Sequence, residues 1–335
     1  MKTTQFLVAT LIALFALPAA AAPEPTKNPF LWVVEKDGHA PSFLYGTMHV
    51  PDDRVLALPD VVEQALDRCD AFYAELDMAP ANMMKQQKIM MIPNGEPGLS
   101  KILPQETKDK VQKVLKKYGF PMAMLDRLQP WALAMQLQSM DFLKDMLAGK
   151  KPLDMALFER CKNAGKEVGG VEIVEEQVGV FSDLTQEESI LFLDQSAEMM
   201  LMEKGEGKGL IEQMIEAYVS GDMDKLIAIM DESSGADNEE ELTPEMKALN
   251  EKVEAKLLVD RNHRMAERMT KHMTENPERC YYFAVGTAHY PGDEGVLKLL
   301  EKEGFTIRRL KAGDTLPGAE PAKAAPSSEG KTRKF

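Results

Sequence analysis

Cysteine is scarce in this chain of 335 residues, which contains only three, Cys69, Cys161 and Cys280. They form no Cys-x-x-Cys pair, so the sequence supports neither a dithiol redox motif nor a thiolate zinc site. An odd count permits at most one disulfide in an oxidising compartment. Cys69 and Cys280 are the expected pair, because each lies just outside a predicted strand.

Several motifs that define enzyme classes are also missing. The sequence has no Gly-x-Ser-x-Gly nucleophile elbow, no phosphate-binding P-loop, no His-Glu-x-x-His and no Gly-x-Gly-x-x-Gly fingerprint. Positive charge is in deficit, with 40 Lys and Arg against 54 Asp and Glu, a net charge of −14. Such a balance excludes a nucleic-acid backbone as the expected partner and is typical of a solubilising surface.

Long apolar runs are absent after the first residues. Lys2 precedes the apolar run 6–17, and small residues follow it at 18–22. This pattern predicts a secretory signal peptide over residues 1–22, because the run is too short to span a bilayer. Since no cysteine follows this run and no later run reaches spanning length, we expect a periplasmic or secreted protein without a stable membrane anchor. Nothing in the sequence predicts its oligomeric state.

One eight-residue phrase occurs twice. It reads GTMHVPDD at 46–53 and GTAHYPGD at 286–293. From 22 Gly and 5 His, a Gly-x-x-His pair is expected only about 0.3 times by chance. Each phrase follows a short apolar run typical of a strand, and proline two residues after each histidine ends ladder pairing. We therefore expect His49 and His289 at carboxyl ends of strands, where open α/β sheets bind ligands. The alternative is two tight turns with unremarkable histidines.

A helix and a further strand are predicted after each phrase, so two matching units bracket the chain. We expect an α/β fold with a central mixed sheet built from both ends of the chain, flanked by helices and carrying a large helical insertion. A single domain is expected over 29–311, with the insertion at about 80–165 and 185–275. The tail 312–335 is predicted to be disordered from its composition. The expected strands are 30–35, 42–45, 70–77, 166–174, 281–285 and 305–310.

Acidic residues near the ends of predicted inner strands are the other candidates for chemistry. Period-2 alternation places Glu75 and Asp77 on one face of their strand, and Glu172 lies near the end of the strand 166–174. Buried acids need a partner, a metal or substrate, although an exposed strand end would explain them as well. Imidazole with carboxylate suits Mn, Fe, Co or Zn. The same groups suit metal-free water activation, with His as general base.

The segment 78–91 is rich in methionine, with Met78, Met83, Met84, Met90 and Met91. Methionine is a soft filler of apolar gaps and also a surface for adaptable recognition. Helix packing, a lid over an apolar substrate and binding of a soft metal are the alternatives.

Taken in order, these motifs resemble the TraB/GumN family over about residues 29–311. The resemblance is carried by LWVVE at 31–35, FLYGTMHV at 43–50, AELD at 74–77, GVE at 170–172, EEQ at 175–177, Arg261-Asn262 and VGTAHYPG at 285–292. That family is related to the metal-dependent Tiki proteases, which have two Gly-x-x-His motifs, and more distantly to the erythromycin esterase and ChaN-like group.

The resemblance implies that His49, Glu75 and His289 share one site and hold a divalent ion (Mn, Co, Zn or Fe), with Glu172 as a further ligand or general base. It also implies that Arg261 reaches the same site as an anchor for a substrate or a carboxylate, and that Asn262 and Asp77 bind substrate. The leading expectation is an exported metal-dependent hydrolase, a peptidase acting on a peptide or other small substrate. The alternatives are a non-catalytic binding protein for a peptide or haem-like ligand, and a metal-free esterase-like hydrolase.

Overall fold

A computed structural model of the protein describes residues 23–202, 209–233 and 243–318. The predicted signal peptide and residues 319–335 of the predicted tail lie outside these ranges. Residues 312–318, which the composition assigned to the tail, contact the domain. Ala312 donates its backbone N–H to the carbonyl of Lys27, Arg68 bonds to the carbonyl of Pro317, and Leu316 is buried.

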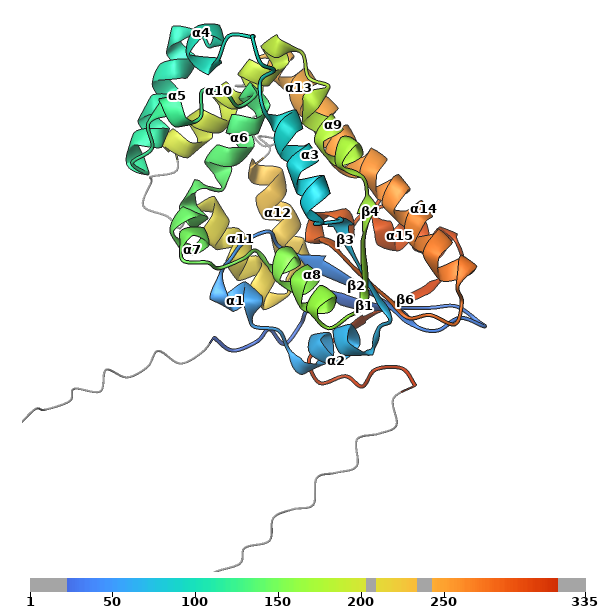
Figure 1. Cartoon of the computed structure of the whole chain (residues 1–335). Coiled ribbons are helices and arrows are strands. Elements are labelled where there is room, and N and C mark those ends of the chain that lie inside the picture. Colours follow the sequence, from blue (N-terminus) through green and yellow to red (C-terminus); the bar gives the residue numbers. More distant parts are fainter. Residues whose placement is uncertain (1–22, 203–208, 234–242, 319–335) are drawn as a thin grey trace, which may run out of the picture.

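The centre of the molecule is a six-stranded mixed sheet in the order β4-β3-β5-β2-β1-β6, which confirms the predicted fold class (Figure 1). β2, β5, β3 and β4 are mutually parallel, whereas β1 runs antiparallel to both β2 and β6. The late strand β5 lies between the early strands β2 and β3, so both ends of the chain build the sheet. The strands are β1 Leu31–Glu35, β2 Ser42–Thr47, β3 Ala71–Leu76, β4 Glu167–Glu172, β5 Tyr281–Gly286 and β6 Thr306–Leu310.

Side-chain alternation along β3 shows which helices cover each face of the sheet. Phe72 packs edge-on against Phe158 of α8 (Leu153–Asn163), whereas Tyr73 packs on His272 of α14 (Asp260–Glu275). Helices α8 and α14 therefore lie on opposite faces. Glu75 shares a face with Tyr73 and points toward α14.

The remaining helices surround this layer. Two short ones, α1 Asp53–Leu56 and α2 Asp60–Arg68, follow the first motif, and α15 Val296–Lys302 follows the second. The inserted helices are α3 Pro80–Met90, α4 Leu99–Ile102, α5 Gln105–Lys117, α6 Pro130–Gln138, α7 Leu143–Leu147, α9 Val174–Ser182, α10 Gln186–Met202, α11 Leu210–Ser220, α12 Met223–Ser233 and α13 Pro244–Glu254. Short 3₁₀ helices lie at Met122–Met124, Met140–Phe142 and Thr287–His289.

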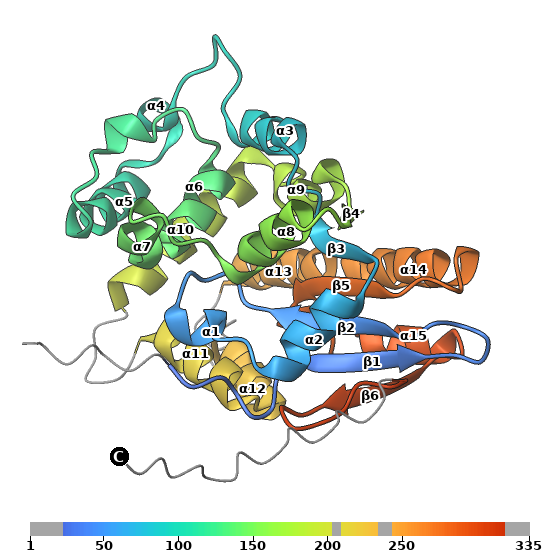
Figure 2. The same ribbon diagram turned by 60° about the horizontal axis from the view of Figure 1, so that its bottom comes forward.

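The helical insertion divides between two cores. Helices α5, α6 and α10 bury one another's apolar faces in a lobe beside the sheet (Figures 1 and 2). Helices α8, α11 and α14 instead contribute to the core of the sheet, through residues such as Leu157, Tyr218 and Met265. The insertion is therefore not a separate unit, because part of it is needed to cover the sheet.

Irregular helical turns and free cysteines are local features of the fold. The 3₁₀ turn at Met140–Phe142 separates α6 from α7. A π-helical segment, Ala255–Val259, lies between α13 and α14. Cys69 and Cys280 are buried thiols, so the expected disulfide is wrong for this structure; burial and the adjacent Cys280 thiol raise the pKa of Cys69.

A glycine pair allows β4 to approach β3 closely. A Cβ atom on Gly169 would lie 2.6 Å from the ring of Tyr73, and one on Gly170 would meet the backbone where β3 ends. Gly169 and Gly170 therefore keep β4 paired with β3 and bring Glu172 opposite Leu76.

Candidate active site at the carboxyl edge of the sheet

The two motif histidines meet at one edge of the sheet, as predicted. β2 and β5 are neighbouring parallel strands, and Thr47 pairs with Gly286 at their carboxyl ends. His49 follows β2 by two residues, and His289 ends the 3₁₀ turn after β5. The hydroxyl of Thr287 donates to the carbonyl of Thr47 at 2.9 Å, so the second motif holds the first in place.

Glu75, near the end of β3, lies between the histidines. Its Oε1 is 3.5 Å from Nε2 of His49 and 3.7 Å from Nε2 of His289, and it accepts the backbone N–H of Gly286 at 2.6 Å. Its Oε2 accepts from Gln177 and Arg261. Burial raises the pKa of this carboxyl, but His49, His289 and Arg261 outweigh it and hold the pKa well below its usual range. Glu75 is therefore ionised.

Gly286 leaves the space around which these three groups converge. A Cβ atom there would lie 2.9 Å from Oε1 of Glu75 and 3.6 Å from both Nε2 of His49 and Cδ2 of His289. The first glycine of the second motif thus allows the histidines and the carboxylate to face one another.

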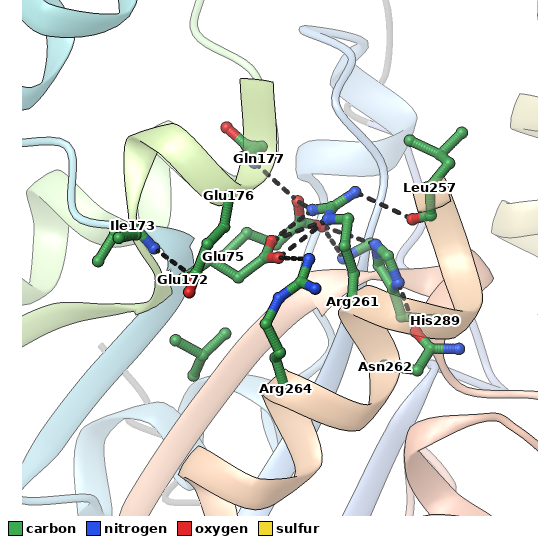
Figure 3. Close-up of polar contacts among 12 residues, drawn as sticks. Glu75, Glu172, Ile173, Glu176, Gln177, Leu257, Arg261, Asn262, Arg264 and His289 are labelled. Atoms are coloured by element: carbon green, nitrogen blue, oxygen red, sulfur yellow. Dashed lines mark hydrogen bonds and ion pairs between the residues drawn. The ribbon is translucent and has the colours of Figure 1, made fainter. Parts of the chain in front are cut away.

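Arg261 forms ion pairs with two buried carboxylates, those of Glu75 and Glu172 (Figure 3). Its Nη2 is 2.7 Å from Oε2 of Glu75 and 2.6 Å from Oε2 of Glu172, and its Nε donates to both oxygens of Glu172. Its Nη1 donates to the carbonyl of Leu257 in the π-helical segment. The Glu172 side chain is fully buried, and burial raises its pKa against the opposing effect of Arg261. We therefore assign Arg261 to anchoring the carboxylates of Glu75 and Glu172, one of the two roles expected of it. Glu172, which was expected as a further ligand or general base, is its ion-pair partner.

Asn262 orients His289 instead of facing outward. Its Oδ1 lies 2.7 Å from Nδ1 of His289, and its Nδ2 donates to the carbonyl of Glu294. An amide oxygen can only accept, so Nδ1 of His289 carries the proton and the lone pair of Nε2 points toward Glu75. Burial lowers the pKa of His289 to about 4. A neutral imidazole lone pair therefore faces a carboxylate.

His49 is the exposed member of the site. Its side chain is 54% exposed, whereas those of Glu75, Arg261 and His289 are at most 8% exposed. Its Nδ1 lies 3.1 Å from Oδ1 of Asp154. Desolvation lowers the pKa of His49, but the carboxylates of Asp154 and Glu75 raise it well above its usual value. The site is therefore open to solvent on the side of His49.

Asp77 bonds to residues at the start of α3. Its carboxylate accepts from the backbone N–H of Ala79 and from the side chain of Asn82. In the methionine-rich segment, Met78 and Met90 pack against buried clusters, as expected for a packing role, whereas Met84 is 71% exposed.

Three contacting residues were not found from the sequence. Asp154 lies in the first turn of α8, where acidic residues are common because they interact favourably with the helix dipole. Gln177 lies in the EEQ motif, and its contact with Glu75 depends on how α9 packs. Tyr218 of α11 donates its hydroxyl to the carbonyl of Gly46 at 2.8 Å and so braces the first motif. Each of these three contacts joins segments that are far apart in the sequence, so no local spacing predicts it.

The imidazole nitrogens of His49 and His289 and the carboxylate of Glu75 are ligand types that suit a divalent ion. Ligand atoms at ~2.1 Å from a tetrahedral ion lie about 3.4 Å apart, close to the two separations between imidazole nitrogens and Oε1 of Glu75. The lone pair of His289 facing Glu75 also favours a cation between them. Within residues 23–202, 209–233 and 243–318, however, no three His, Cys, Asp or Glu side chains form a ready metal-holding group.

Parallel strands ending in paired Gly-x-x-His loops around a buried Glu–Arg–Glu cluster define an α/β protein with a histidine–carboxylate site. The chain belongs to the TraB/PrgY/gumN family, whose sequence model matches residues 30–309. It is 27% identical over 319 residues to "Metalloprotease TIKI2" of Danio rerio, covering 84% of this chain and 60% of that protein. It is 26% identical over 323 residues to "Metalloprotease TIKI1" of Homo sapiens, covering 85% and 63%.

A relative from Nematostella vectensis, "Metalloprotease TIKI homolog", is 23% identical over 339 residues, covering 91% of this chain and 72% of that protein. The chain spans about three fifths of the length of the first two relatives. No solved structure matches the chain. Among the described residues, no helix is both long and apolar enough to cross a membrane.

Proposed function

We propose that the protein is a metal-dependent hydrolase that cleaves peptides, with His49, Glu75 and His289 holding the ion. The observation that carries this proposal is the convergence of two imidazole Nε2 atoms on one oxygen of Glu75, at 3.5 and 3.7 Å. Similarity to proteins named metalloproteases supports the same reaction class. The sequence of residues 1–22 supports export as part of this proposal.

Each residue of the site has a separate role in the proposed reaction. When bound, a divalent ion would lower the pKa of a water molecule and polarise the scissile carbonyl. Glu75 supplies negative charge that Arg261 keeps in place, and Asn262 fixes the His289 ring. His49, being half exposed, borders the incoming substrate and is placed to exchange a proton with it.

The test compares wild-type protein, purified without a histidine tag, with the His49→Ala plus His289→Ala variant. His39→Ala is the matched control, because His39 lies in the turn before β2, at the opposite end of that strand. We expect about one ion per chain in wild type and control and loss of both ion and peptide cleavage in the double variant. Equally negligible metal with unchanged cleavage in all three would refute the proposal.

One observation favours a second candidate, a metal-free hydrolase. The pair of Asp154 with His49 has the arrangement of an oriented general base, with Nε2 on the exposed side. Peptide or ester hydrolysis that survives exhaustive treatment with chelators, and is lost in His49→Ala, would identify this reaction instead.

A further inference from the structure

Each motif histidine has a different partner at Nδ1, and the two partners come from opposite faces of the sheet. His289 is held by the amide of Asn262 on α14, at 2.7 Å. His49 lies 3.1 Å from the carboxylate of Asp154 on α8. Both imidazoles thereby present Nε2 to Oε1 of Glu75.

Asp154 is held firmly and has no competing partner for the oxygen that faces His49. Leu153, Leu157 and Phe158 of the same helix are buried in the core of the sheet, so α8 is fixed against β3 and β4. Asp154 itself lies in the first turn of this helix. The side chain is 16% exposed, and its buried Oδ1 lies 3.1 Å from Nδ1 of His49 and makes no hydrogen bond to any other group among the described residues.

From this geometry we infer that Asp154 is the positioning residue of His49: its carboxylate accepts a hydrogen bond from Nδ1–H and fixes the ring so that Nε2 faces Glu75. A ring that is half exposed has few packing contacts to orient it, so the carboxylate supplies the constraint. Histidines at metal and catalytic sites are commonly oriented by such a partner on the second nitrogen. The helical insertion therefore completes the site as well as surrounding it.

The inference rests in part on the proposed function, so its test begins with a measurement that needs neither metal nor turnover. In metal-free protein, an Nδ1–H hydrogen-bonded to a carboxylate gives a slowly exchanging, strongly downfield proton resonance, which ¹⁵N-imidazole NMR assigns through its absence in His49→Gln. We expect this resonance in wild type and its loss in Asp154→Ala. Glu159→Gln, a charge removal elsewhere on α8, should retain it.

The second measurement is affinity for Co²⁺, followed by its visible absorption. We expect Asp154→Ala to weaken binding about 10- to 100-fold, Asp154→Asn to weaken it less, and Glu159→Gln to leave it unchanged. Circular dichroism establishes that each variant is folded.

The outcomes separate the two proposals. A resonance that is absent from wild type, or that persists in folded Asp154→Ala, overturns the role of Asp154. A resonance lost in Asp154→Ala, with no Co²⁺ bound by wild type, supports the role of Asp154 and counts against the metal-dependent function.

Discussion

Replacing Arg261 by methionine removes the cation shared by two buried carboxylates while keeping a long side chain on α14. In the wild type the guanidinium lies 2.6 Å from Glu172 and 2.7 Å from Glu75. Methionine leaves Glu172 with only a distant cation, since Nη2 of Arg264 is 3.8 Å from its Oε1. The variant must therefore keep a poorly compensated charge in the interior or bind a proton.

The expected cost is about 3–5 kcal/mol of unfolding free energy, because breaking one side of a buried ion pair leaves an uncompensated charge. A domain of this kind is stable by roughly 5–15 kcal/mol, so the variant should still fold. Adding Glu172→Gln to Arg261→Met removes the negative charge of Glu172, which the single variant leaves buried without its main cation. We expect a favourable coupling of about 1–3 kcal/mol in the double variant.

Urea denaturation followed by circular dichroism measures these differences. Arg308→Met is the matched control, because Arg308 lies 3.9 Å from Asp314 in an exposed pair worth about 0–1 kcal/mol. If Arg261→Met changes the unfolding free energy no more than Arg308→Met does, the description of a buried charge cluster around Glu75 is refuted.

Three further predictions test neighbouring contacts. Gly286→Ala should abolish Co²⁺ binding and peptide cleavage, because its Cβ would lie 2.9 Å from Oε1 of Glu75; titration that matches wild type would contradict this. Tyr218→Phe should lose about 1–3 kcal/mol in urea unfolding, since the buried carbonyl of Gly46 loses its 2.8 Å donor. Gly179→Ala, in α9 with nothing within 4 Å of the new Cβ, should raise stability by about 0.5–1 kcal/mol; a lower melting temperature would show that α9 is packed more tightly than described.

Much of the sheet could be predicted from the sequence because its strands are short apolar runs with clear ends. The strand predicted at 281–285 matches β5 to within a residue. The repeated motif predicted both histidines at strand ends. Neighbouring parallel strands bring them together around Glu75, which the sequence had also named as a candidate.

The roles of the other candidates depended on which partner each side chain finds. Asp77 alternates with Glu75 along the sequence, but β3 ends at Leu76, so its carboxylate bonds to the start of α3. Arg261 was expected to anchor a substrate or a carboxylate. Its guanidinium forms ion pairs with the carboxylates of Glu75 and Glu172. Asp154 was missed because a lone acidic residue at a helix start has no distinctive spacing.

The order of strands has a consequence for how the protein is made. β2 and β3 are both present once about a quarter of the chain has been synthesised, yet they do not pair with each other. The strand that joins them, β5, begins at Tyr281. Until then, two edges rich in unpaired backbone groups remain open to other chains. The central pairing closes a loop of more than 200 residues, which slows folding. His49 and His289 cannot meet earlier, so the site at the carboxyl edge of the sheet assembles only after nearly the whole domain has been synthesised.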